Sequence, residues 1–123
     1  KILEKRTMNS NHIHPPRKIR VGQDKQIEIS HCLNLQLNPD EQVTLLTDSK
    51  KEFDVVRKSW GYYATPSVNS RLKKQGFKTA LVKNLNNSHY VMLVEIDQMD
   101  SFREYLQEEQ SEIVQWLDEL PKK

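Results

Sequence analysis

The chain of 123 residues has one cysteine, three glycines and no long apolar run, and each shortage excludes a class of protein. A single thiol, Cys32, forms neither an intrachain disulfide nor a cysteine-based zinc site, so we expect a structural role for it. Three scattered glycines do not form a phosphate-binding loop or a dinucleotide fingerprint. No apolar run approaches the ~20 residues of a membrane-spanning helix, and no secretory signal is recognisable. We therefore expect a cytoplasmic protein without a membrane partner.

Charge is distributed unevenly along the sequence. Residues 50–90 carry nine basic and two acidic side chains, whereas residues 91–123 carry three basic and nine acidic ones. The basic block has two interpretations. It binds an anionic partner, or the acidic C-terminal segment packs beside it and neutralises it.

The N-terminal residues 1–16 lack sustained periodicity and end in two prolines. This pattern predicts an arm or linker, or sequence derived from a vector, because such segments bury little apolar surface. The remainder, residues 17–123, is predicted to be one α+β domain. Its length is that of a single ordinary domain.

The first half of this domain has the pattern of an antiparallel sheet or partly rolled β-layer. Between residues 26 and 37, apolar and polar residues alternate, which predicts a strand with one buried face. Turn-forming residues follow it at Asn38-Pro39-Asp40. The strands predicted in this half are 17–21, 26–37, 42–47 and 53–63, the last bent at Gly61.

The second half adds helices to this layer. Thr65 as N-cap, Pro66 at the first position and Gly76 as the stop predict a short helix over 66–75. Strands are predicted at 77–83 and 89–96, joined as a hairpin and covered on both faces because apolar residues occupy both.

Helices are predicted over residues 100–120. Ser101 and Glu104 have the spacing of a capping box, and apolar residues recur at helical spacing as far as Leu120. A strand over 112–117 is the competing interpretation, because the pattern beyond Gln107 is ambiguous. The acidic residues of this segment, Glu109 and Asp118 among them, are predicted to form a polar helical surface.

A ligand-binding site is predicted where aromatic residues meet the start of the 66–75 helix. Free amides at a helix start attract anions, and flat rings and cations nearby suit a nucleotide-like ligand or unpaired bases. The predicted site residues are Trp60, Tyr62, Tyr63, Ser67, Arg71 and Lys74. The competing interpretation is that Trp60 and one of the tyrosines belong to the core and that the lysines form a solvated face.

Three histidines form a second candidate site. His12 and His14 stand two apart, which on a strand places both on one face, and His31 lies at an inward position of the 26–37 strand. Together they could bind a divalent metal. The competing interpretations are a surface arm for the first two and a hydrogen-bonded core histidine for the third.

These features favour a non-enzymatic binding or accessory domain that recognises an anionic, phosphorylated or nucleotide-like small molecule, with no cofactor. One alternative is a small metal-dependent β-fold enzyme that uses the three histidines. The others are a single-stranded nucleic-acid-binding protein and a protein–protein adaptor, for which opposite charges at the two ends permit self-association.

Overall fold

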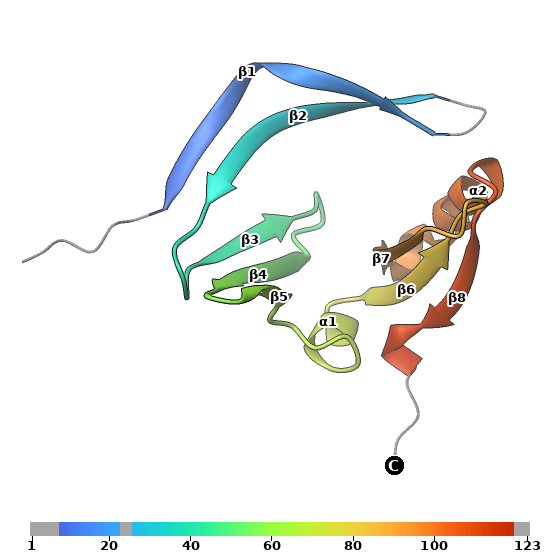
Figure 1. Cartoon of the computed structure of the whole chain (residues 1–123). Helices are drawn as coiled ribbons and strands as arrows, with labels where there is room; N and C mark the ends of the chain where they lie inside the picture. The colour runs from blue at the N-terminus through green and yellow to red at the C-terminus, as the bar shows by residue number, and fades with distance from the viewer. Residues whose placement is uncertain (1–7, 23–25, 120–123) are drawn as a thin grey trace, which may run out of the picture.

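Alternating apolar and polar residues give this chain more strand than helix. The computed structural model describes residues 8–22 and 26–119, and its described part has the predicted α+β fold (Figure 1). Its antiparallel strands form three sheets, whereas the sequence predicted one sheet or layer. The strands are β1 (Asn9–Val21), β2 (Ile27–Gln36), β3 (Gln42–Leu46), β4 (Glu52–Lys58), β5 (Gly61–Ala64), β6 (Phe77–Lys83), β7 (His89–Glu95) and β8 (Glu112–Trp116). The helices are α1 (Arg71–Lys74), η1 (Ile96–Gln98), α2 (Met99–Glu108) and η2 (Leu117–Glu119).

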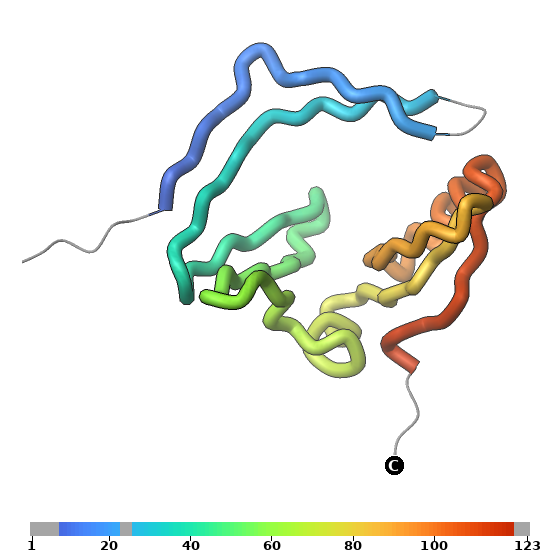
Figure 2. Tube along the Cα trace, in the orientation of Figure 1, coloured from blue at the N-terminus to red at the C-terminus, as the bar shows by residue number. Residues whose placement is uncertain are grey.

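The predicted strand over 26–37 is confirmed as β2, which pairs with β1 to form a long hairpin. The arm predicted over 1–16 is wrong from Asn9 onward, since those residues belong to β1, and residues 1–7 lie outside the described part. Pro15 and Pro16 fit into β1 because the pairing with β2 is interrupted between His12 and Arg17. Proline has no amide hydrogen, and at this interruption no hydrogen bond to the neighbouring strand is lost. Figure 2 shows the hairpin arching over the other strands.

The second sheet has the order β3-β4-β5. The strand predicted over 53–63 is in fact two strands, because a two-residue turn at Ser59 and Trp60 reverses the chain and Lys58 pairs with Gly61. A positive φ of 146° at Gly61 permits this reversal, a conformation that residues with a side chain rarely adopt. β3 and β5 are therefore both edge strands.

The third sheet has the order β7-β6-β8 and carries the core of the protein. The hairpin predicted from 77–83 and 89–96 is confirmed by the pairing of β6 with β7. α2 packs on one face of this sheet. There, the buried residues Ala80, Val82 and Leu106 are surrounded by half-buried apolar side chains. The prediction that both strands are covered on both faces is wrong for β7, where Val91 is 62% exposed.

The last strand corrects a predicted helix. β8 stands where the second of the C-terminal helices was predicted, and the competing strand prediction is right. A bulge between the partners of Leu81 and Val82 places Ile113 and Trp116 opposite Val82 and Ala80, on one face of the sheet. The spacing of three that suggested a helix therefore comes from the extra residue in a strand. The predicted capping box is also absent, because α2 begins after Gln98 without a side-chain cap.

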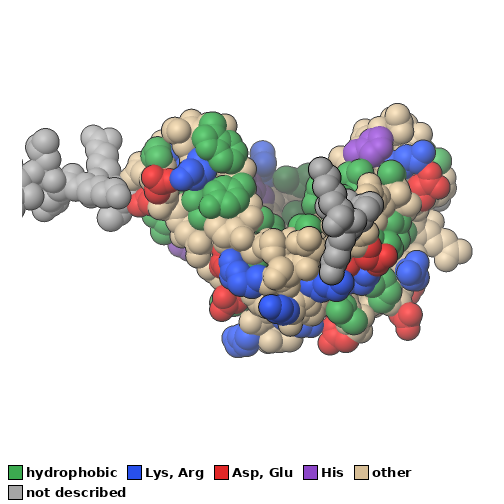
Figure 3. All heavy atoms as spheres, turned by 90° about the horizontal axis from the view of Figure 1, so that it is seen from below, with side chains coloured by type: hydrophobic (Ala, Val, Ile, Leu, Met, Phe, Trp, Pro, Cys, Tyr) green, Lys and Arg blue, Asp and Glu red, His purple; other side chains and the backbone are tan. Residues whose placement is uncertain are grey.

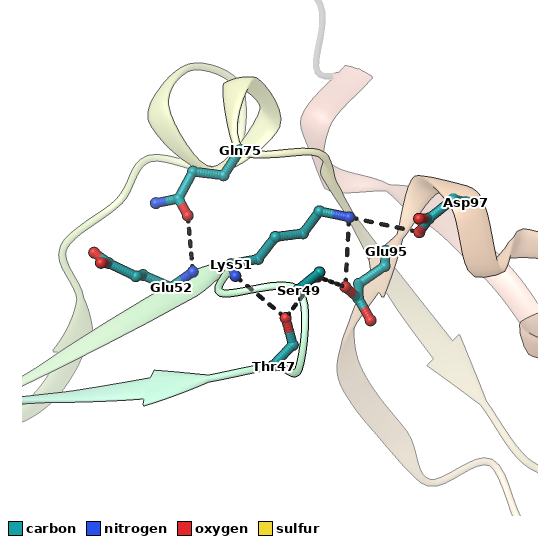
Figure 4. A network of polar contacts seen from close by, with 7 residues as sticks. All are labelled: Thr47, Ser49, Lys51, Glu52, Gln75, Glu95 and Asp97. Carbon is teal, nitrogen blue, oxygen red and sulfur yellow. Dashed lines mark hydrogen bonds and ion pairs between the residues drawn. The ribbon is translucent and has the colours of Figure 1, made fainter.

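A polar network joins the second sheet to the third (Figure 4). Lys51, beside the β3–β4 turn, forms ion pairs with Glu95 at 3.4 Å and with Asp97 at 3.5 Å. Ser49 donates to Glu95 at 2.8 Å, and the amide of Glu52 donates to Gln75 at 2.7 Å. These contacts hold the β3–β4 turn beside the end of β7.

Candidate functional site

The three predicted rings lie on the surface around β5. Trp60 is 69% exposed, Tyr62 60% and Tyr63 45%, and the rings of Trp60 and Tyr63 stack with their centroids 6.1 Å apart. The interpretation that assigned Trp60 and one of the tyrosines to the core is therefore wrong. They form an exposed aromatic patch on an edge strand.

The helix start predicted beside these rings does not exist at Pro66. Only Arg71–Lys74 is helical, with Ser70 as an N-cap that makes no side-chain hydrogen bond. Pro66 is buried, and the amide of Leu72 donates to the carbonyl of Ser67 within a turn. The amide of Arg71 also donates to the hydroxyl of Ser67, so the first amides of α1 already have acceptors, and a single turn has no appreciable dipole. The amide nest predicted for an anion is therefore not formed.

Arg71 binds a carboxylate of its own chain. Its guanidinium donates to Asp54 and to Thr65, each at 3.0 Å, and Asp54 is 4% exposed. A hydrogen bond from Thr44, together with this arginine, lowers the pKa of Asp54 below its ordinary value despite burial. Arg71 is thus held in place as a structural ion pair, whereas Lys74 is exposed and forms no ion pair with the described residues.

Three of the nine cations of the basic block pair with the acidic C-terminal segment. The pairs are Lys51 with Glu95 and Asp97, Lys78 with Asp118 and Glu119, and Lys83 with Glu112. Lys78 also lies over the ring of Trp116 at 4.7 Å. The interpretation that the C-terminal segment neutralises this block therefore holds for these three residues, whereas Lys58 pairs with Asp40.

The histidines do not form the predicted metal site. Within residues 8–22 and 26–119, no group of three histidine, cysteine or carboxylate side chains could hold a metal ion. His12 and His14 are exposed, and His31 is half-buried opposite Arg17. The Nδ1 atom of His31 is buried without a hydrogen-bond partner, so its prediction as a hydrogen-bonded core histidine is not confirmed. Cys32, on the opposite face, is exposed and free.

A groove lined by apolar side chains crosses from the second sheet to the third. Two adjoining hollows share Thr47, Phe77 and Leu93, and together they run from β3 and β4 to α2. We call this surface the apolar groove; its larger apolar side chains are Leu45, Leu46, Phe53, Phe77, Leu93, Phe102 and Tyr105, and the polar residues Thr47, Lys51, Glu95, Gln98 and Ser101 also line it. Leu45 and Leu46 are 54% and 60% exposed on an edge strand. Seen from below, the molecule is hollowed between two raised parts that carry hydrophobic side chains (Figure 3).

The hairpin presents a second, partly uncovered apolar surface. The side chains that alternate onto one face of β2, which we call the hairpin stripe, are Ile27, Ile29, Leu33 and Leu35. No residue of β1 or β2 is buried, and the two strands pair with each other while making only slight contact with the other elements. A period of two over ten residues is typical of a strand with a covered face. In the single chain this face is covered only in part: Leu33 and Leu35 are half-buried, whereas Ile27 and Ile29 are exposed.

The apolar groove was not predicted from the sequence, although β7 carried a signal for it. The run of apolar residues over 90–94 is typical of a strand covered on both faces. α2 covers one face of β7. The other face, which carries Val91, is open. β7 is an edge strand with one open face although its sequence is typical of a strand buried on both faces. Whether a strand lies at an edge depends on which strands pair, and this cannot be read from the strand's own sequence.

Comparison with protein-family models finds no match, and no curated protein or solved structure is significantly similar to the chain. None of the described helices is long and apolar enough to cross a membrane. Function is therefore inferred from the two partly uncovered apolar surfaces, the aromatic patch and the charges that surround them.

Proposed function

We propose that this chain is a non-enzymatic binding module that assembles with a second copy of itself through the apolar groove. The observation that carries the proposal is the groove itself, a largely apolar surface open on edge strands. Soluble monomers rarely expose a contiguous patch of this kind, and exposed edge strands are normally blunted or covered. Leu45 and Leu46 stand on such an edge without a charged neighbour in β3.

Charge and shape favour a second copy as the occupant. The described hairpin carries three basic residues and one acidic residue, whereas α2, beside the groove, carries three acidic residues and one basic. The acidic residues of α2, which are Asp100, Glu104 and Glu108, form no ion pair with the described residues. Lys18 and Arg20 lie on the opposite face of the hairpin, where both pair with Glu28. Arg17, opposite His31, shares the face of the hairpin stripe and is the cation that would meet a groove flanked by acidic residues. Two copies related by a twofold axis can make both contacts at once.

The experiment that tests this proposal is the mass of the protein in solution. Sedimentation equilibrium should give a particle of twice 14.5 kDa, because association removes the exposed apolar side chains of the groove from water.

The exposed aromatic patch supports a second candidate function, the binding of a flat anionic ligand such as a nucleotide. Trp60 and Tyr63 offer a stacked pair of rings, and Lys74 is free to contact a phosphate. Stacking on exposed rings contributes about 1–3 kcal/mol for each base. With Arg71 held by Asp54, the rings are the principal binding element.

Adenosine monophosphate should quench the fluorescence of Trp60, and a Trp60→Leu variant should lose this response while Trp116 still fluoresces. A short single-stranded oligonucleotide serves as the second probe. An affinity that falls steeply between ~50 and ~200 mM salt would identify nucleic acid as the preferred ligand. An unchanged spectrum with both probes would exclude this function.

A further inference from the structure

A pocket separate from the aromatic patch lies where the tip of the hairpin approaches the third sheet. Its volume is about 300 Å³, and its lining comes from both ends of the described chain. Val21 and Ile27 contribute from the hairpin, Tyr90 and Met92 from β7, and Tyr105 and Glu109 from the α2 segment. It is the right size for a small ligand or for one side chain of a partner.

Glu109 is the unusual member of this lining. It is 9% exposed, and its Oε2 atom is buried without a hydrogen-bond partner among the described residues. Its backbone, by contrast, is satisfied, since its amide donates to Tyr105 at 2.9 Å and its carbonyl accepts from Ser111 at 3.3 Å. Buried carboxylates are normally paired, because leaving one unpartnered is costly. The Oε2 atom of Glu109 therefore lacks a hydrogen-bond donor, and the pocket is large enough for a ligand that supplies one.

Two tyrosines complete the chemistry of the pocket. Burial, with the nearby charge of Glu109 and the hydroxyl of Tyr90, raises the pKa of Tyr105 above its ordinary value. All three side chains line the same pocket. Aromatic faces attract cations, and a carboxylate accepts charge-assisted hydrogen bonds from them. No lysine or arginine is among the described residues that line the pocket.

We infer that this pocket binds an ammonium or guanidinium group. Glu109 accepts its N–H donors and neutralises its charge, while the rings of Tyr90 and Tyr105 contact its faces. Val21 and Ile27 add apolar contacts on the hairpin side, although both are partly exposed. The described lining comes from one chain, but Ile27 also belongs to the hairpin stripe and Tyr105 to the apolar groove, so the test must separate this pocket from the assembly.

The test is a calorimetric titration with agmatine, which carries both cationic groups. The parent chain should bind it, and Glu109→Gln should weaken binding about tenfold or more, because a charge-assisted hydrogen bond and an ion pair are lost. Glu104→Gln, which removes an exposed carboxylate of α2, is the matched control and should leave the affinity unchanged. Glu109→Gln should also raise Tm, because it removes a buried unpaired charge, so loss of binding does not reflect unfolding.

Two further probes identify the source of the cation and separate this site from the assembly. Equal or tighter binding of N-acetyl-arginine methylamide assigns the pocket to a polypeptide side chain, whereas binding of agmatine alone assigns it to a free amine. A Leu46→Lys chain, which the assembly proposal predicts to be monomeric, should bind at least as tightly as the parent, because the described lining comes from one chain. Absence of binding by both probes at about 10 mM, which is weaker than any specific site of this kind, or equal binding by Glu109→Gln and the parent, would overturn the inference.

Discussion

Replacing Leu46 by lysine should convert the dimer into monomers. The side chain is 60% exposed in the single chain and lines the apolar groove, so the substitution leaves the monomer's packing intact. In the dimer it would bury an unpaired ammonium at the interface. That costs about 2–4 kcal/mol, which weakens association roughly thirtyfold to several hundredfold. Sedimentation of the variant measures this loss directly.

Leu85→Lys is the matched control for that substitution. Leu85 is 64% exposed, and it lies in the loop between β6 and β7, outside the apolar groove. The control adds the same charge at a similarly exposed leucine, so it should associate as the parent does. Equal association of all three proteins would show that the groove is not the interface. Thermal unfolding of each variant should stay within about 0.5 kcal/mol of the parent monomer, as is usual for surface substitutions.

Replacing Asp118 by alanine should destabilise the third sheet strongly. This carboxylate is buried at 4% exposure, and it accepts hydrogen bonds from the amide of Thr79 at 3.0 Å and from Lys78 at 2.9 Å. Its removal leaves a buried amide in the central strand without an acceptor, which costs about 1–3 kcal/mol. Urea unfolding at neutral pH should show a lower midpoint with an unchanged slope.

The same carboxylate should make stability depend on pH. Burial alone would raise the pKa of Asp118, but hydrogen bonds from Lys78 and Thr79 outweigh it and lower the pKa below the ordinary value of 3.8. A lowered pKa in the folded state stabilises the fold above the unfolded pKa, and this contribution is lost as the pH falls through the folded pKa. The difference between the parent and Asp118→Asn should therefore shrink below about pH 4.

Glu119→Gln controls for the loss of an acid beside Lys78. Glu119 pairs with the same ammonium at 2.6 Å, but its side chain is 55% exposed. The Glu119→Gln substitution should therefore lower the free energy of unfolding by only a few tenths of a kcal/mol. A parent that unfolds at the same urea concentration as Asp118→Ala would contradict the structural role of this carboxylate.

Most strands of this fold could be predicted from the sequence, but which of their faces are buried could not. Alternation in β2 reports that one face is apolar, which is a local property of the segment. Whether that face is buried depends on what packs against it, and no residue of β2 is buried in the chain. The alternation therefore predicts that one face of β2 is buried, but it does not predict which part of the protein, or which partner, buries that face.

The helices were predicted least well, for two physical reasons. At 66–70, serine and asparagine side chains favour turns over helix, so only Arg71–Lys74 is helical although the start and stop residues suggested more. At 112–116, the bulge gives Ile113 and Trp116 a common face at a spacing that a helix would also produce.

The candidate sites were predicted unevenly. The exposure of Trp60, Tyr62 and Tyr63 agrees with a role in binding, which remains a proposal, whereas the amide nest required a helix that is too short. Glu109 was assigned to the polar face of α2, but it is buried. Its spacing of seven from Phe102 and three from Leu106 places it on the buried face, so the helical period contained the signal.

The central claim is that a second copy covers the apolar groove, and sedimentation equilibrium of the parent chain over a dilution series tests it most directly. We predict a particle of twice 14.5 kDa that dissociates toward one chain on dilution, by a single monomer–dimer equilibrium. A particle of 14.5 kDa at every concentration would contradict the claim, and the apolar groove would then need a different occupant.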